Sequence, residues 1–496
     1  MMYLHRRQFL IGPQKFMLNE SWKAYPVNDS TWLSCCPDLQ ILKAVDANGN
    51  AWYLLGLAVE TLDKKVSPER EIARTQSAQV PDLYASWAGR WALVSSRHCH
   101  LDASGLLGCF YGHDSEGHLW ASSSAALVAQ VLFSGQSPEI DPRRLSYEAG
   151  ISWYTPPCSR FAGISRLLPS QVLDLQSGKI LPRPLMPEIC LERDYEDILQ
   201  QIQQRLVTTL QQLAQLNTEL WLGLTAGYDS RLMLALSERA GIPVRPFTRI
   251  TARMSVADRI LPPKLAEVCQ FTHIFIRNQH RYPERKRLAE LQTACHVSEG
   301  DAEPFIQGIR DNLSGIAFGG HGFSVASGFA QLHTLPDAVT SAEDGARQIA
   351  HIFQEPVESS ATAGIQRWLL WALEHPQKNL NWRDRAFIEQ RQAGWLSSKE
   401  QLYDLTDLTR FPILNSAYLY SLLLSVRAEK RVGSSIQEDL LRQLNPQLIQ
   451  YPFNPGDFYF NPLDVLTCKA QHLPQYIRLK FLKKTRSLWN SFMLRY

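Results

Sequence analysis

The run Leu-Gly-Leu-Thr-Ala-Gly-Tyr-Asp-Ser-Arg at positions 222–231 constrains this chain more than any other feature. An apolar stretch, 220–224, ends at a turn of small residues and leads into an amphipathic pattern over 230–240. A strand, a small-residue loop and a helix start predict an anion-binding site, because backbone N–H groups and the positive helix end converge there. We therefore expect a phosphate-binding loop made of Leu224, Thr225, Ala226, Gly227 and Ser230.

Asp229 lies inside this run, where a carboxylate alone would repel a phosphate. A divalent cation between the carboxylate and the phosphates removes that repulsion, and hard cations prefer carboxylate oxygen. The position therefore predicts that Asp229 holds Mg²⁺. The plainer interpretation is an ordinary strand–turn–helix in which Asp229 caps the helix.

The order of elements around this loop indicates a parallel sheet. Helical periodicity over 195–216, 230–240 and 256–269 alternates with strand-like runs at 219–224, 244–250 and 273–277, although Pro262 and Pro263 threaten the third helix. Alternating strands and helices place a ligand at the carboxyl ends of the strands. Beyond Pro336 the pattern is mostly helical, and an apolar stretch at 411–426 indicates a buried helix.

The first 185 residues follow a different pattern. Short strand-like runs at 91–94, 106–111 and 118–122 are separated by turn sequences, which is typical of a β-rich domain. A proline-containing stretch at 182–191 marks the change. The sequence therefore predicts two domains, 1–185 and 190–496.

Four stretches, taken in order, resemble the asparagine-synthetase-like superfamily. They are 102–111 with 119–123, 161–173, the loop at 222–231 (usual form Ser-Gly-Gly-x-Asp-Ser), and Gly-Gly-His-Gly-Phe-Ser-Val-Ala-Ser-Gly-Phe at 319–329. The resemblance implies an α+β and α/β protein. Its N-terminal part would be a glutaminase-like (Ntn-type) β sandwich with helices. Its C-terminal part would be a pyrophosphate-loop α/β synthetase domain with a parallel sheet and a helical end. An unrelated β-rich N-terminal domain is the alternative.

The resemblance also implies that Gly320, His321 and Gly322 line the other side of a nucleotide. His321 would reach a phosphate or an attacking amine; a purely structural loop histidine is the alternative. Family glutaminases carry an N-terminal cysteine nucleophile, whereas here position 2 is Met2 and the first cysteine is Cys35. The 1–185 domain is therefore expected to be degenerate, as in the lasso-peptide cyclases and β-lactam synthetases of the superfamily, and glutamine is not the expected ammonia source.

Two further departures concern charge. Where relatives carry an acidic residue in the second loop, this chain has Ser324, and Glu438 precedes Arg442 where relatives have a lysine. Lys430 and Arg431 are candidates for the missing positive charge. Acidic candidates for a metal are Glu299, Asp301 and Glu303, better explained as a solvated turn, and Asp258, better explained as a helix cap.

These observations predict an ATP-dependent synthetase that forms an amide bond through an acyl-adenylate, with Asp229 as the catalytic residue and ATP and Mg²⁺ bound. The acyl substrate would be a small-molecule, peptide or polymer carboxylate. The alternatives are a non-catalytic relative that binds a nucleotide or a partner, and a lasso-peptide-type macrocyclase. A thiolating or nucleic-acid-adenylating enzyme is disfavoured, because the chain has no CxxC pair and a net charge of only +3.

Composition sets the remaining expectations. Nine scattered cysteines fit reduced thiols and a cytoplasmic protein, and no window of about 18 apolar residues predicts a membrane span. No nucleic-acid partner is expected. The tail at 476–496 carries six basic and no acidic residues between apolar ones. It is a candidate for peripheral contact with a membrane or a partner protein, or else a terminal helix packed on the domain.

Overall fold

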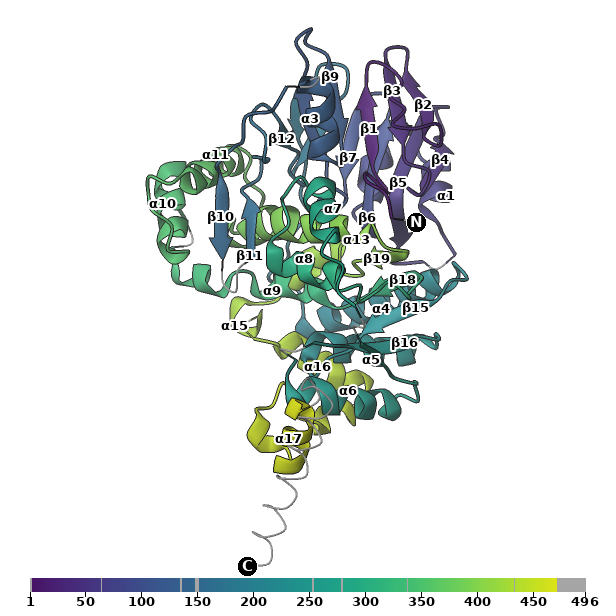
Figure 1. Ribbon diagram of the computed structural model, residues 1–496, viewed down its shortest axis with the longest axis vertical. Helices are drawn as coiled ribbons and strands as arrows, with labels where there is room; N and C mark the ends of the chain where they lie inside the picture. The colour runs from purple at the N-terminus through teal and green to yellow at the C-terminus, as the bar shows by residue number, and fades with distance from the viewer. Residues whose placement is uncertain are drawn as a thin grey trace, which may run out of the picture.

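The computed structural model describes residues 2–63, 65–133, 136–147, 151–251, 254–277, 280–336, 338–431 and 433–470. Antiparallel β sheets form the N-terminal region, and a parallel five-stranded sheet with helices forms the C-terminal region, as the sequence predicts (Figure 1). The basic tail at 476–496 lies outside the described residues.

The N-terminal region is built on two six-stranded antiparallel sheets that face each other across one core. Phe9 and Leu33 from the first sheet and Leu55 and Val94 from the second belong to the same buried cluster. The first sheet has the order β12 (Ser165–Arg166), β8 (Phe110–His113), β9 (Leu119–Ser122), β1 (Phe9–Gly12), β3 (Thr31–Cys35), β2 (Lys23–Asn28). The second has the order β14 (Ile180–Pro182), β13 (Gln171–Asp174), β7 (His98–Leu101), β6 (Trp87–Ser95), β5 (Ala51–Glu60), β4 (Ile41–Val45).

Short helices cover the outer faces of this sandwich. The helix α3 (Ala125–Phe133) packs on the first sheet around Phe110 and Leu127, and α1 (Pro68–Ala73) with α2 (Val80–Leu83) packs on the second. A separate hairpin joins β10 (Arg144–Tyr147) to β11 (Ile151–Tyr154). The strand expected at 106–111 begins only at Phe110, because the Asp102 carboxylate accepts hydrogen bonds from the N–H groups of Leu106 and Leu107 and holds a turn.

The C-terminal sheet has five parallel strands in the order β17 (Ile274–Arg277), β16 (Arg245–Ile250), β15 (Leu220–Gly223), β18 (Gly315–Phe318), β19 (Leu408–Phe411). The helix α5 (Tyr228–Ala240) connects β15 to β16, which confirms the strand–helix–strand unit. The helices α4 (Tyr195–Ala214) and α6 (Val256–Val268) also match the expected positions. The helix α6 continues without a break through Pro262 and Pro263.

Helices make up most of the chain beyond the sheet. The expected buried helix at 411–426 is instead the end of β19 followed by α14 (Ala417–Ser425), because Pro412 cannot donate to the strand ladder and begins a turn closed by Asn415. The remaining helices are α7 (Arg285–Gln292), α8 (Glu299–Ile306), α9 (Ser324–Ser327), α10 (Ala342–Ile352), α11 (Ser360–Glu374), α12 (Trp382–Ala386), the π-helical η5 (Phe387–Leu396), α13 (Ser397–Tyr403), α15 (Ala428–Arg431), α16 (Ser435–Leu444) and α17 (Pro462–Ala470).

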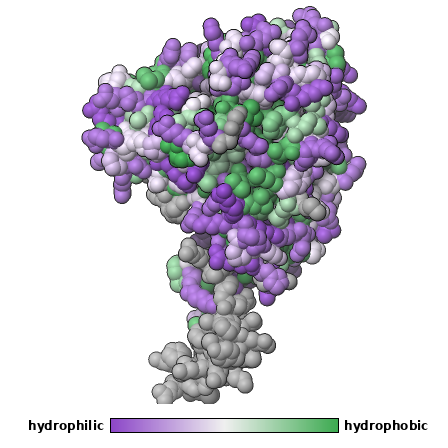
Figure 2. Space-filling model, turned by 45° about the horizontal axis from the view of Figure 1, so that its top comes forward, coloured by the Kyte–Doolittle hydropathy of each residue, from purple (hydrophilic) through white to green (hydrophobic). Residues whose placement is uncertain are grey.

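The two regions share a hydrophobic core. Leu57 and Ala88 of the second N-terminal sheet belong to the same buried cluster as Phe411 and Tyr420 of the C-terminal region. In the face shown in Figure 2, hydrophilic side chains cover most of the surface and hydrophobic surface gathers in the middle. Among the described residues, no helix combines the length and the apolar character needed to cross a membrane.

Candidate nucleotide site

A cavity of about 770 Å³ opens at the carboxyl edge of the parallel sheet. Four of the five strands contribute to it: Leu224 and Thr225 follow β15, Thr248 lies near the end of β16, Gly319 follows β18, and Arg410 lies on β19. Open parallel sheets bind ligands at this edge, because the loops that follow adjacent strands diverge there. The position of the cavity agrees with the one expected from the alternation of strands and helices.

Most of the residues expected at a nucleotide site line this cavity. Two do not: Ala226 is fully buried beneath the loop, and Gly322 packs against Leu414, where an added Cβ would lie 2.2 Å from the Leu414 Cβ. The expected residues that do line it are Leu224, Thr225, Gly227, Asp229, Ser230, Gly320 and His321.

The small-residue loop uses several of its own N–H groups internally. The Thr225 N–H donates to the Ser230 hydroxyl at 3.0 Å, and the Gly227 N–H donates to the Thr225 hydroxyl at 3.2 Å. The Ala226 N–H donates to the Asp258 carboxylate at 2.8 Å. These three N–H groups therefore have acceptors within the protein. No side chain caps the helix α5, so its first turn presents the positive helix end to the cavity.

Asp229 occupies this first turn. Its Oδ1 accepts a hydrogen bond of 2.9 Å from the Gln437 side-chain amide on α16, and burial raises the pKa of the carboxyl while this hydrogen bond opposes the shift. The second loop crosses directly over it: a Cβ added to Gly320 would lie 2.7 Å from the Asp229 Cβ. Only glycine allows the two loops to approach so closely.

Two residues that the sequence left open or missed hold the loop in place. Asp258 accepts from the Ala226 N–H and also from the Ser255 hydroxyl at 2.9 Å, so it fixes the loop and the start of α6 together. Arg231 is fully buried and donates to the carbonyls of Ala226 and Pro452 at 2.8 and 2.9 Å. Arg231 thereby ties the C-terminal segment to the loop, and no local pattern distinguishes it from any other helical arginine.

His321 lines the cavity, whereas Ser324, three residues later, does not. His321 is an exposed residue, and the surrounding cavity walls together with repulsion from Arg410 and Lys399 lower its pKa below the ordinary value of 6.5. The imidazole is therefore neutral at physiological pH. The Ser324 hydroxyl donates to the His321 carbonyl at 2.7 Å and does not line the cavity. It gives the loop a local hydrogen bond.

Four basic residues that the sequence did not indicate line the cavity. Arg249 lies on β16, Arg310 precedes β18, Lys399 lies on α13 and Arg410 lies on β19, and all four line the cavity. Tyr403 lies among them, with the Arg310 guanidinium 4.2 Å from its ring centroid. These residues are scattered through the sequence and meet only because the sheet brings their elements together.

The other charged residues suggested from the sequence, unlike Asp229 and Asp258, do not line the cavity. Glu438 pairs with Arg442 along α16, Lys430 lies over the Tyr195 ring, and Arg431 bonds to Asp384 at 3.1 Å. The acidic segment expected as a solvated turn is instead the start of α8, and these acidic residues pair with neighbouring basic side chains: Glu299 with Lys286, Asp301 with Lys399, and Glu303 with Arg281.

Few side chains near the cavity are free to act as metal ligands. Within the described part of the chain, no three histidine, cysteine or acidic side chains group together as a metal site. Asp229 has one oxygen engaged by Gln437, and both Asp258 oxygens already accept hydrogen bonds. The described residues do not form a closed metal site, and Asp229 would be the residue to hold a Mg²⁺ ion, which would need further oxygen ligands from a bound group or water.

No protein-family model matches this sequence, and no curated protein matches it.

Proposed function

We propose that the protein is an ATP-dependent synthetase that joins a carboxylate to an amine through an acyl-adenylate, without glutamine as the nitrogen source. One observation carries the proposal. The uncapped start of α5, the Asp229 carboxylate and the glycine loop Gly319–Gly320 meet in one cavity at the carboxyl edge of a parallel sheet. A helix N-terminus attracts phosphate, and a carboxylate beside it makes sense when a cation accompanies the phosphate.

The residues of the cavity support distinct roles in that chemistry. The first turn of α5 and the hydroxyls of Thr225 and Ser230 would bind the phosphates, and Asp229 would hold Mg²⁺. When bound, Mg²⁺ supplies charge neutralisation to the phosphates. His321 is neutral, so it would accept or donate a hydrogen bond without adding charge. The contribution of the protein would be positioning and electrostatic stabilisation.

The first cysteine of the sequence, Cys35, does not fit the role of a nucleophile that releases ammonia from glutamine. Cys35 is fully buried, and burial raises the pKa of its thiol, so it is not a poised nucleophile. The amine would therefore come from ammonia, a small amine or the acyl substrate itself. Closure within one substrate would give a ring, as in a macrocyclase.

The test is calorimetric titration of the full chain with ATP, with and without Mg²⁺. We expect Mg²⁺-dependent binding to the wild type, and Asp229→Asn should weaken it by about tenfold or more, as loss of a charge-assisted contact does. Asp197→Asn, in the first turn of α4, is the matched control and should bind like the wild type. Equal affinity of the wild type and Asp229→Asn for ATP would remove the proposal.

A non-catalytic nucleotide binder is the second candidate. It is favoured by the loop N–H groups that are already bonded at Thr225, Ala226 and Gly227 and, among the described residues, by the lack of any group of three side chains that could hold a metal. Pyrophosphate release from ATP in the presence of a panel of carboxylic acids distinguishes the two. Tight ATP binding with no release above the Asp229→Asn background would favour the binder.

A further inference from the structure

We propose that the cavity contains a second anion subsite, formed by Arg249, Arg310, Lys399 and Arg410 around Tyr403. It would bind a carboxylate or phosphate group of the acyl substrate, separate from the carboxylate that is activated. The acyl substrate would therefore carry at least two anionic groups. This inference rests on the proposed function, because it assigns the nucleotide to the other side of the cavity.

The balance of charge around Tyr403 leaves positive charge in excess. Arg410 is paired with the buried Glu400, at 3.0 Å from Nε to Oε2, and the Lys399 ammonium lies 3.7 Å from Asp301. Within the described ranges, no carboxylate lies within 4.0 Å of Arg249 or Arg310. Two cations therefore face the cavity without a protein counter-charge.

Arg310 gives the strongest support for an anion site, because it has hydrogen-bond donors without acceptors among the described residues. Its Nε and Nη1 are covered from solvent, and neither has a hydrogen-bond partner among the described residues. Its guanidinium stacks on the Tyr403 ring, and burial lowers its pKa to about 10. Buried guanidinium donors without acceptors are costly, and the planar fork matches the oxygens of a carboxylate or phosphate.

The pKa of Tyr403 shows the electrostatic effect of these cations. Burial alone raises the pKa of a phenol, yet the pKa of Tyr403 is lowered because Arg310, Lys399 and Arg410 outweigh the burial. The same cations act on His321. Arg249, Arg310, Lys399 and Arg410 form a positive wall that comes from β16, the segment before β18, α13 and β19, whereas the phosphate loop follows β15, and both line the same cavity.

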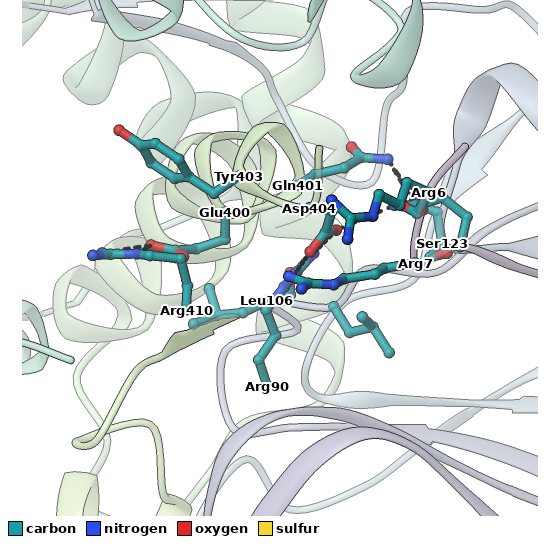
Figure 3. A network of polar contacts seen from close by, with 12 residues as sticks. Arg6, Arg7, Arg90, Leu106, Ser123, Glu400, Gln401, Tyr403, Asp404 and Arg410 are labelled. Carbon is teal, nitrogen blue, oxygen red and sulfur yellow. Dashed lines mark hydrogen bonds and ion pairs between the residues drawn. The ribbon is translucent and has the colours of Figure 1, made fainter. Parts of the chain in front are cut away.

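The positive wall is held rigidly from behind. In Figure 3, Glu400 extends from α13 to Arg410 and Tyr403 extends on the same side of the helix, while Gln401 and Asp404 extend toward the N-terminal region. Asp404 accepts hydrogen bonds from Arg90 at 2.5 and 2.9 Å, and Gln401 donates to the Ser123 carbonyl at 3.2 Å. A helix fixed on one side presents its other side in a set geometry, as a binding site requires.

The test uses calorimetry on the full chain loaded with Mg²⁺ and α,β-methylene-ATP, which cannot be cleaved to AMP. Inorganic phosphate and glutarate are the probes for the anionic group, and butyrate is the single-carboxylate comparison. We expect saturable binding of phosphate and glutarate, stronger for glutarate than for butyrate. Arg310→Gln should weaken both by about tenfold, the value of one charge-assisted contact, and leave nucleotide affinity unchanged.

Arg249→Gln is a second variant that disturbs no ion pair of the described residues, and it should also weaken the probes. Arg245→Gln is the matched control, because this exposed arginine lies at the opposite end of β16 and pairs with Glu219. Loss of nucleotide affinity without loss of probe affinity in Arg310→Gln would assign the wall to the nucleotide's own phosphates and overturn the inference. Absence of saturable binding by both probes would overturn it as well.

The two proposals fail in different ways. If the wild type takes up no nucleotide yet binds glutarate in a manner that depends on Arg310, the synthetase proposal falls and the anion subsite stands. If nucleotide binds with dependence on Asp229 while both probes ignore Arg310, the synthetase proposal stands and the subsite falls.

Discussion

Asp258 shows how one side chain connects the loop to the rest of the sheet. Its Oδ1 accepts from the buried Ala226 N–H, and its Oδ2 accepts from Ser255, the N-cap of α6. In Asp258→Ala the Ala226 N–H has no partner inside the protein, so we expect the free energy of unfolding to fall by about 1–3 kcal/mol. Because the loop is no longer fixed, ATP affinity should also fall. Urea unfolding and calorimetry measure the two effects.

Asp344→Ala is the control for this experiment. Asp344 has the same place after a capping serine, at the start of α10, but its described contacts are local to that helix and reach no loop of the cavity. It should cost less stability and leave ATP binding intact. A loss of stability in Asp258→Ala with unchanged ATP affinity would reduce Asp258 to the helix cap that the sequence favoured.

Asp229 and Asp258 differ in how far the local sequence encodes their positions. Asp229 falls in the cavity because a strand, a tight loop and a helix start are encoded within ten neighbouring positions, 222–231. The hydrogen bond from Ala226 to Asp258 depends on how β16 and α6 pack, and no local pattern encodes it. Arg310 and Arg410 are likewise far apart in sequence and become neighbours only through the order of strands in the sheet.

The helices and strands differ in how clearly their sequences predict them. The helices α4 and α5 have clear apolar periodicity and were predicted within a few residues. The strands β18 and β19 have four residues each and give no alternation long enough to detect. Missing them hid the edge of the sheet that carries Arg410, and with it the positive side of the cavity.

The helix α13 is the element that joins the two regions. Asp404 directly follows it and pairs with Arg90, both nearly fully buried. In Asp404→Ala the Arg90 guanidinium is left buried without its counter-charge, so we expect a loss of about 3–5 kcal/mol in the free energy of unfolding. Asp407→Ala removes an exposed partner of Arg6 and should cost less than about 1 kcal/mol.

Urea unfolding of both variants measures this difference, and a probe for anion binding extends it. If α13 positions the positive wall, Asp404→Ala should also weaken glutarate binding, whereas Asp407→Ala should not. Equal stability losses in the two variants would show that the buried pair contributes no more than the exposed one, and that α13 is held by packing alone.

In the whole molecule, the N-terminal antiparallel sheets and the C-terminal parallel sheet share one core. The antiparallel sheets use strands up to β14, and the parallel sheet begins with β15. One hydrophobic cluster nevertheless runs from Leu57 and Ala88 through Leu222 to Leu423. The N-terminal region supports the cavity through that core and through the pairing of Arg90 with Asp404.

Buried histidines make the stability of this molecule sensitive to acid. Burial lowers the pKa of His5 to about 4 and that of His296 to about 3, and it lowers that of His100 well below its ordinary value of 6.5. His296 shows the cause: its Nε2 accepts from the Arg160 N–H at 3.2 Å and its Nδ1 faces the Thr293 carbonyl at 2.8 Å, which fixes the neutral ring. A proton on Nε2 would break the first of these bonds.

Below pH 6.5 the unfolded chain binds protons at these three histidines that the folded chain refuses, so the free energy of unfolding should fall as the pH drops toward 4. Each histidine contributes up to about 1.4 kcal/mol per pH unit in that window. Glu71, whose pKa burial raises to about 7, opposes the trend, and so does Asp229, whose pKa burial also raises. Urea midpoints measured from pH 7 to pH 4.5 should therefore decline, and less steeply in His296→Gln, whose stability at pH 7 is lower because the paired ring is gone. His118→Gln, at a half-exposed site, should keep the slope of the wild type. A wild-type slope retained in His296→Gln would show that the proton uptake on unfolding arises elsewhere.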